Sequence, residues 1–263
     1  MKTAPILLSV LLLAMAKLPL GCGSRIQQSP KPAAMGPNTP AAQASVAPEP
    51  VVKPLPLPAT GPMVIITSPV KDEEVNSTDV GVFLEVKDWP GDRGAHVHVV
   101  LDDLPPEDVA DPMLPTVFRH VKPGLHVARA FACRSDHVSY KNPAALATVW
   151  FRVAGEGKGA PLDPAAPTLT FNQPGAVCSR DAAKRLPVDF LLSGVAMDDL
   201  AAWRVRVSLD GEQKFVLDAS NYLDVFLPPL EAGEHAVRLE LMDSRGRAMK
   251  ANFAWSERIV SVR

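Results

Sequence analysis

Short runs of alternating apolar and polar residues recur from Met63 to the end of the chain, separated by clusters of Gly, Pro and Asp. An alternation of period two places apolar side chains on one face of a β-strand and polar side chains on the other. No stretch shows the pattern of a long helix. Short strands at this spacing, joined by polar turns, are typical of antiparallel β-sandwiches. The predicted strands are Val64–Thr67, Val80–Val86, His96–Leu101, Leu125–Cys133, Ala147–Val153, Thr168–Phe171, Val188–Leu192, Trp203–Leu209, Lys214–Leu217, Ala236–Met242 and Ile259–Val262.

The strand pattern occurs twice. The run VHVVLDD, which starts at Val97, matches VRVSLDG, which starts at Val205. The run KPGLHVARA at Lys122 matches EAGEHAVRL at Glu231. Matching positions lie about 105 to 109 residues apart with little drift, which indicates an internal duplication.

The repeated motifs V-x-V-x-L-D and G-x-H-x-x-R resemble those of bacterial immunoglobulin-like or fibronectin type III-like modules. The resemblance covers most of residues 63–263. It implies an all-β chain with two tandem Ig-like sandwiches at 63–154 and 167–263, joined by a linker at 155–166. Such modules serve as scaffolds or binding units, and any function must be argued from a site.

The N-terminus adds a targeting signal. Lys2 precedes the apolar run Ile6–Ala16, which is too short to span a bilayer, so residues 1–21 are predicted to be a signal peptide. The segment that ends in Leu-Gly-Cys22 resembles a bacterial lipoprotein signal, although Pro19 stands where such signals usually carry leucine. The resemblance implies a lipid on Cys22, and secretion with cleavage elsewhere is the alternative.

Composition sharpens this picture. The chain contains 27 prolines, more than usual, and much of the excess lies in residues 22–62. These residues lack apolar periodicity and are predicted to be a disordered Pro/Ala-rich tether. The net charge of -2 and the absence of a basic face argue against nucleic acid. Gly23 follows the candidate lipid site, where inner-membrane lipoproteins often carry Asp. We therefore expect a protein in the cell envelope, at the outer membrane or in the periplasm.

The pair His96 and His98 raises the question of a metal site. Residues i and i+2 share one face of a strand, with Cα atoms roughly 7 Å apart, so two imidazoles could share an ion. A stable site needs further ligands. His120, Asp102 and Asp103 are candidates, but no spacing singles them out.

The second copy carries Arg204 and Arg206 at the positions of His96 and His98. Guanidinium does not ligate metal under ordinary conditions. We therefore interpret the histidine pair as a solvated or interface face and assign no metal ligand there. Metal binding through the pair stays as the alternative.

Catalysis and cofactors find no support in the sequence. Residues Ser135–Asn142 contain Ser, His and Asp, but no nucleophile elbow, P-loop, G-x-G-x-x-G or C-x-x-C motif occurs. His126 and His235 recur just after the turn glycines, and we interpret them as hydrogen-bonded structural residues. We expect no enzyme activity and no cofactor.

Four further residues are candidates for contacts. Alternation places Phe131 and Cys133 on an outer face, so either the 134–146 loop or the second domain covers them, or a bulge exchanges the two faces. Cys133 and Cys178 form a candidate disulfide or stay free. Trp89, in a turn-like stretch, either contacts a ligand or folds over the end of its domain.

Together these patterns predict an exported, lipid-anchored, non-enzymatic protein. It would act through its tandem sandwiches as a binding or spacer module in the cell envelope, held to the membrane by its N-terminal lipid. Phe131 and Trp89 are the candidate contacts for a protein or glycan partner. The alternative function is metal binding by His96 and His98.

Overall fold

The structure is a computed structural model, which describes residues 60–89, 93–109, 111–156, 161–219 and 225–263. The predicted signal peptide, the lipid site Cys22 and the tether up to residue 59 lie outside the described residues. Within the described part of the chain, no helix has the length and apolar character needed to cross a membrane.

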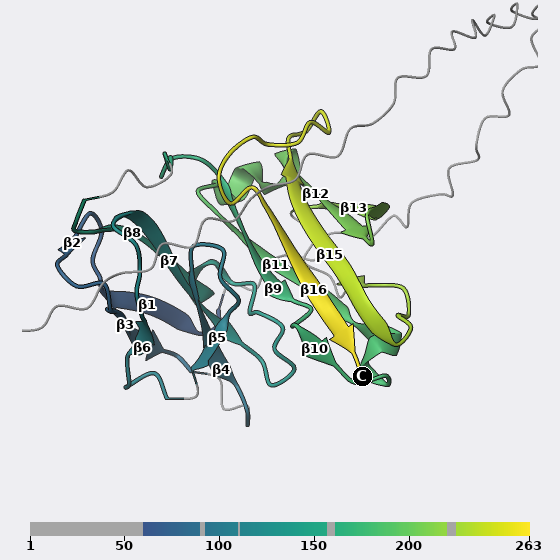
Figure 1. Cartoon of the computed structure of the whole chain (residues 1–263), viewed down its shortest axis with the longest axis horizontal. Coiled ribbons are helices and arrows are strands. Elements are labelled where there is room, and N and C mark those ends of the chain that lie inside the picture. The colour runs from purple at the N-terminus through teal and green to yellow at the C-terminus, as the bar shows by residue number, and fades with distance from the viewer. Residues whose placement is uncertain (1–59, 90–92, 110, 157–160, 220–224) are drawn as a thin grey trace, which may run out of the picture. The chain divides into compact units, whose positions relative to one another are not determined.

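The first sandwich consists of two packed sheets (Figure 1). One sheet has the strand order β1-β3-β6 and the other has the order β2-β8-β7-β4-β5. The short 3₁₀-helix η1 (Pro143–Ala145) precedes β8. The strands are β1 (Met63–Ser68), β2 (Glu74–Val75), β3 (Val80–Lys87), β4 (His96–Leu101), β5 (Glu107–Val109), β6 (Thr116–Phe118), β7 (Gly124–Cys133) and β8 (Leu146–Val153).

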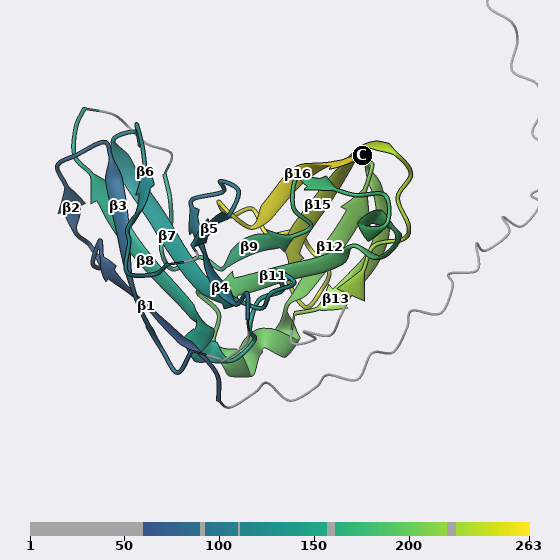
Figure 2. The same cartoon turned by 90° about the horizontal axis from the view of Figure 1, so that it is seen from below.

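The second sandwich repeats this topology (Figure 2). Its sheets have the orders β14-β11-β9 and β10-β16-β15-β12-β13, so each strand takes the place of the strand eight numbers earlier. Two 3₁₀-helices, η2 (Ala182–Arg185) and η3 (Met197–Ala202), lie between strands. The strands are β9 (Thr168–Gln173), β10 (Val177–Cys178), β11 (Pro187–Ser193), β12 (Arg204–Leu209), β13 (Glu212–Asp218), β14 (Val225–Phe226), β15 (Gly233–Met242) and β16 (Trp255–Val262). The predicted all-β fold with two tandem sandwiches is confirmed.

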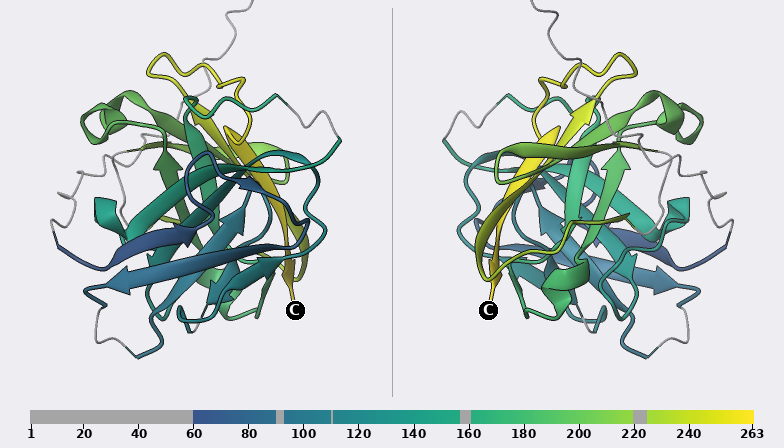
Figure 3. Two further views of the ribbon diagram at one scale, coloured as in Figure 1. Left: turned by 90° about the vertical axis from the view of Figure 1, so that its left-hand side faces the viewer. Right: turned by 90° about the vertical axis from the view of Figure 1, so that its right-hand side faces the viewer.

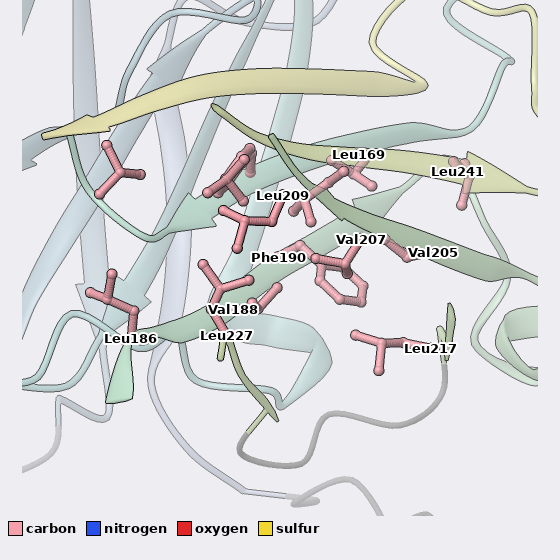
Figure 4. Close-up of a cluster of buried hydrophobic side chains, with 14 of the residues drawn as sticks. Leu169, Leu186, Val188, Phe190, Val205, Val207, Leu209, Leu217, Leu227 and Leu241 are labelled. Atoms are coloured by element: carbon pink, nitrogen blue, oxygen red, sulfur yellow. The ribbon is translucent and has the colours of Figure 1, made fainter. Parts of the chain in front are cut away.

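Each sandwich has its own apolar core between its two sheets. In the first copy, Val97 and Val99 of β4 are fully buried, and Val205 and Val207 of β12 are their buried counterparts. Figure 4 shows how β9 and β11 on one side and β12, β13 and β15 on the other send side chains into the second core. Figure 3 shows the layered strands from two opposite sides. The alternation read from the sequence therefore assigns the inward faces of β4 and β12 correctly.

Both copies have the same hydrogen-bonded turn. Asp102 follows β4 with a φ of 52°, and its Oδ2 lies 2.7 Å from Nδ1 of His126, whose Nε2 lies 2.7 Å from the carbonyl oxygen of Lys122. Asp210 and His235 repeat the carboxylate contact at 2.8 Å. Both ring nitrogens face acceptors, so the protonated ring can donate from each of them. The structural interpretation of His126 and His235 is confirmed.

The outer face of β7 is covered by the second sandwich. Phe131 and Cys133 have no exposed surface and form a buried cluster with Val100 of β4 and Leu191 of β11. The strand β4 pairs with β7 without a register shift, so no bulge exchanges the faces. The prediction that Phe131 contacts an external partner is wrong, because the second sandwich already buries this side chain.

Polar groups extend the same junction. Arg129 of β7 is 1% exposed, and its guanidinium donates to the carbonyl oxygen of Leu169 at 3.1 Å and to Oγ1 of Thr170 at 2.9 Å. Both acceptors belong to β9. The junction thus consists of the outer face of β4 and β7 against the outer face of β9 and β11.

The disulfide left open by the sequence is not formed, because Cys133 and Cys178 are both free. Cys133 is enclosed in the junction, whereas Cys178 lies on the short edge strand β10 beside β16. Trp89 follows β3 and is 38% exposed, so it stays a candidate contact.

Candidate metal centre

Four side chains with metal-ligating atoms converge at one end of the first sandwich. His96 and His98 come from β4, Asp108 from the edge strand β5, and His137 from the turn after β7. One ligand atom from each lies within 4.8 Å of all the others. The pairing of β4 with β5 sets His98 directly opposite Asp108. The pairing of β4 with β5 therefore positions three of the four candidate ligands, and the turn after β7 positions the fourth.

The distances between these atoms fit a common ion. Nε2 of His96 lies 2.9 Å from Nε2 of His98 and 3.0 Å from Nδ1 of His137. Nε2 of His98 lies 3.3 Å from Nδ1 of His137 and 2.8 Å from Oδ1 of Asp108. Ligands about 2.0–2.1 Å from a tetrahedral zinc ion stand about 3.3 Å apart. The four donors are therefore already near the spacing of a tetrahedral site.

Hydrogen bonds outside the cluster fix the tautomers of two rings. Nδ1 of His96 lies 2.9 Å from the carbonyl oxygen of Gly94, which only accepts. Nδ1 of His98 lies 2.7 Å from Oδ1 of Asn172. Each ring therefore carries its hydrogen on Nδ1 and presents the lone pair of Nε2 to the cluster. Metal-ligating histidines are oriented by outer hydrogen bonds of this kind.

A shared cation would stabilise the four donor atoms of the cluster. The Nε2 lone pairs of His96 and His98 face each other, and a carboxylate oxygen of Asp108 approaches the same point. A single proton can bridge only one pair of these atoms, whereas a metal ion satisfies all four. Burial lowers the pKa of His98 to about 4, against the opposing effect of the hydrogen bond to Asn172. His98 is therefore neutral near pH 7 and available as a ligand.

The backbone of His137 is itself informative. His137 adopts a φ of 64°, in the left-handed region that L-residues other than glycine rarely occupy. The matching position in the second sandwich is Gly246, with a φ of 74°. The turn is held by Asp136, whose side chain accepts from the Val138 amide and from Arg134. The same turn accepts glycine in the second copy, so the turn itself does not require the imidazole of His137.

The second sandwich provides an internal comparison. Its residues at the four matching positions are Arg204, Arg206, Val216 and Gly246, as the strand registers and the turn show. Guanidinium, an aliphatic chain and a hydrogen offer no metal ligand. Arg206 instead pairs with Glu240 at 2.7 Å. The fold therefore does not require the cluster, which is particular to the first copy.

Several expectations from the sequence need correction. His96 and His98 are 8% and 2% exposed, so the pair faces an interface and not solvent. The third ligands considered, His120, Asp102 and Asp103, are not members of the cluster. His120 is exposed, and its backbone amide donates to Asp79.

The two ligands missed by sequence reasoning are His137 and Asp108. The duplication contains a signal for His137, since the spacing of about 109 residues sets it opposite Gly246. Asp108 gives no comparable signal, because β5 is only 3 residues long. Its role follows from the pairing of strands alone.

The cluster borders an open cleft of about 740 Å³. His98, Asp108 and His137 line one side, and residues of the second sandwich, among them Gln173 and Arg258, line the other. The side chains of His137 and Asp108 are 45% and 59% exposed. An ion can therefore reach the site from solvent, while the two ligands of β4 stay buried behind it.

The donor set defines the chemistry. Imidazole nitrogen favours Zn²⁺ and neighbouring transition metals, whereas Mg²⁺ and Ca²⁺ favour sites built of oxygen. Three nitrogens and one carboxylate oxygen complete a tetrahedron, the usual geometry of a structural zinc site. Catalytic zinc sites instead keep one position for water. The arrangement is suited to holding an ion tightly and not to activating water.

No protein-family model and no curated protein matches the chain. Among solved structures, fibronectin(III)-like modules of CbhA from Clostridium thermocellum are 16% identical with a TM-score of 0.27, covering 76% of this chain and 94% of that one. A putative membrane anchored protein from Corynebacterium diphtheriae is 10% identical with a TM-score of 0.30, and the match covers 76% of this chain and 53% of that one. SGBP-B from Bacteroides ovatus, solved with a mixed-linkage heptasaccharide, is 14% identical with a TM-score of 0.24, covering 76% of this chain and 47% of that one. The chain thus spans about half the length of the last two. The strand order of the two sandwiches is that of the immunoglobulin-like architecture.

Proposed function

We propose that this protein is a non-enzymatic, tandem-sandwich protein of the cell envelope that binds a zinc-like transition-metal ion through His96, His98, Asp108 and His137. The observation that carries the proposal is the convergence of four ligand atoms within 4.8 Å of one another. Outer hydrogen bonds hold two of the four ligands in the tautomer that metal binding needs.

The non-enzymatic part of the proposal rests on the number of ligands. Four protein ligands occupy all positions of a tetrahedral ion, so no position remains for a reacting water. Such a site contributes its binding free energy to the stability of the fold. The ion then serves the binding or spacer role of the tandem sandwiches by holding the junction region in one arrangement.

The envelope part of the proposal rests on the N-terminal sequence. A lipid on Cys22 would anchor the chain to a membrane, and the proline-rich tether would hold the sandwiches at a distance of up to roughly 100 Å at about 3.1 Å per residue. Exposed Trp89 is the candidate contact for a protein or glycan partner. Fractionation of cells that express wild type and Cys22→Ala tests the anchor, because the variant should leave the membrane fraction.

Metal titration tests the central claim. The purified protein, stripped with a chelator, is titrated with Zn²⁺, and with Co²⁺ as a spectroscopic probe. We expect one ion per chain and an absorption spectrum typical of tetrahedral Co²⁺. Asp108→Ala and His137→Gln alter side chains that are about half exposed, so the fold should survive. Each should weaken binding by more than roughly 10-fold, since even outer-sphere partners contribute 10- to 100-fold.

His120→Gln is the matched control, because His120 lies outside the cluster. It should bind as wild type does. Wild-type protein that retains no ion at equimolar Zn²⁺, or cluster variants with wild-type affinity, would leave a plain spacer or binding module as the function.

A further inference from the structure

Asn172 of β9 links the metal centre to the second sandwich. It is 1% exposed, although all four ligands belong to the first sandwich. We propose that Asn172 is a positioning residue of the metal centre, so that metal affinity depends on the docking of the second sandwich. This inference rests on the proposed function.

The hydrogen bonds of Asn172 define the orientation of its amide. Its Nδ2 donates to the carbonyl oxygen of His137 at 2.7 Å and to Oδ2 of Asp189 at 2.6 Å, and both of these groups are acceptors. Its Oδ1 must therefore face Nδ1 of His98, 2.7 Å away, and accept the hydrogen from that ring. One side chain of the second sandwich thus contacts two of the four ligand residues.

Each contact acts on a ligand. The bond to His98 keeps the hydrogen on Nδ1, so that Nε2 is free for the metal, and it makes this ring a stronger donor to the ion. The bond to the carbonyl of His137 holds the turn that carries the exposed ligand. Loss of Asn172 would release the tautomer of one ligand and the position of another.

Asp189 of β11 extends the connection along the chain. It is 4% exposed and accepts from the amide and the hydroxyl of Ser139, at 3.0 Å and 2.7 Å, and it pairs with Lys141. Ser139 follows His137 by two residues. The segment that carries His137 is therefore attached to the second sandwich through Asn172 and Asp189 together.

The coupling is reciprocal by thermodynamic necessity. If docking of the second sandwich raises metal affinity by some factor, the ion favours docking by the same factor.

The residue of the first copy that matches Asn172 is Thr67, which is exposed. The fold therefore does not need an amide at this position of the first long strand of a sandwich. The distinctive role of Asn172 is its connection to the metal centre.

The test uses two substitutions of this residue and one control. Asn172→Leu keeps the volume and removes the amide, and Asn172→Thr introduces the residue that the first copy carries. Thr170→Val removes a hydrogen bond of the same buried junction, the one from Arg129, without contact to any metal ligand. Zn²⁺ affinity is measured by competition with a chelator, and the tautomer of His98 is measured by NMR of the metal-free protein.

We expect a 10- to 100-fold loss of Zn²⁺ affinity in both Asn172 variants, the range typical for loss of an outer-sphere partner. His98 should also lose its preference for the Nδ1–H tautomer. Thr170→Val should keep both properties, which shows that the effect is not general loosening of the junction.

Three outcomes overturn the inference in distinguishable ways. If wild type binds Zn²⁺ and both Asn172 variants bind it within threefold, the positioning role is wrong while the metal site stands. If Thr170→Val loses as much affinity as the Asn172 variants, the effect belongs to the junction as a whole. If wild type itself binds no Zn²⁺, the proposed function fails first and the inference falls with it.

Discussion

Replacing His137 by glycine should separate metal binding from folding. The φ of 64° at His137 is costly for an L-residue with a bulky side chain, by roughly 1–2 kcal/mol. Glycine removes this cost but gives the unfolded chain more freedom, which destabilises the fold by roughly 0.5–1 kcal/mol. The contacts of the His137 imidazole with His96 and His98 contribute little in the metal-free protein, because the His137 side chain is 45% exposed. The metal-free variant should therefore be within about 1 kcal/mol of wild type in its free energy of unfolding.

Zn²⁺ should make the free energies of unfolding of wild type and His137→Gly differ. An ion that binds only the folded state stabilises it by about 2.7 kcal/mol at a free concentration of 100 times its Kd. Wild type should gain this amount in Zn²⁺, and His137→Gly should gain little. Urea unfolding of both proteins, each in chelator and in Zn²⁺, measures the four free energies.

His120→Gly is the control for the backbone effect. His120 also has a positive φ, of 56°, but lies outside the cluster. It should behave as His137→Gly does in chelator and as wild type does in Zn²⁺. A loss of more than about 2 kcal/mol for His137→Gly in chelator would refute the backbone reasoning, because that exceeds the cost of one ordinary hydrogen bond. Equal stabilisation of both variants by Zn²⁺ would refute the ligand assignment.

Two further predictions concern the remaining histidines and the cysteines. The hydrogen bond to Asp102 raises the pKa of His126 above its usual 6.5, and the bond to Asp210 does the same for His235. The stabilisation from each pair is fully present below pH 6.5 and is lost as pH rises through the raised pKa, so NMR titration of both rings should give midpoints above 6.5, and a midpoint below 6.5 would contradict the charged pair. Burial raises the pKa of the Cys133 thiol, and Cys133 has no exposed surface, so an alkylating reagent should modify Cys178 but not Cys133 in the native protein. Peptide mapping by mass spectrometry measures this, and a peptide linked through Cys133 and Cys178 would contradict the free thiols.

The sequence predicted the parts of the fold that local patterns encode. Alternation along a strand depends only on neighbouring residues, so the long strands and their inward faces could be found. The shortest strands, such as β2, β10 and β14 with 2 residues each, were missed because so few positions show no period. They pair only at the edges of the sheets, so their strand conformation depends on which neighbouring strand the fold brings beside them.

The candidate site was harder to predict because its parts meet through long-range packing. Alternation assigned His98 to the outer face of β4, but it could not show that Asn172, far along the chain, covers that face. The third and fourth ligands come from an edge strand and a turn. The arginines of the second copy point away from a metal site at His96 and His98. The pairing of His137 with Gly246 points toward one, because a turn that accepts glycine does not require a histidine.

The asymmetry between the copies also gives their corresponding outer faces opposite character. The first sandwich docks through the apolar pair Val100 and Phe131, and the strand registers place Ser208 and Glu240 at the equivalent positions of the second. Head-to-tail contacts between identical surfaces generate open-ended filaments unless some unit closes the series. A hydroxyl and a carboxylate in place of two apolar side chains deny a second molecule an equivalent dry surface on this face of the second sandwich, which disfavours head-to-tail association between molecules.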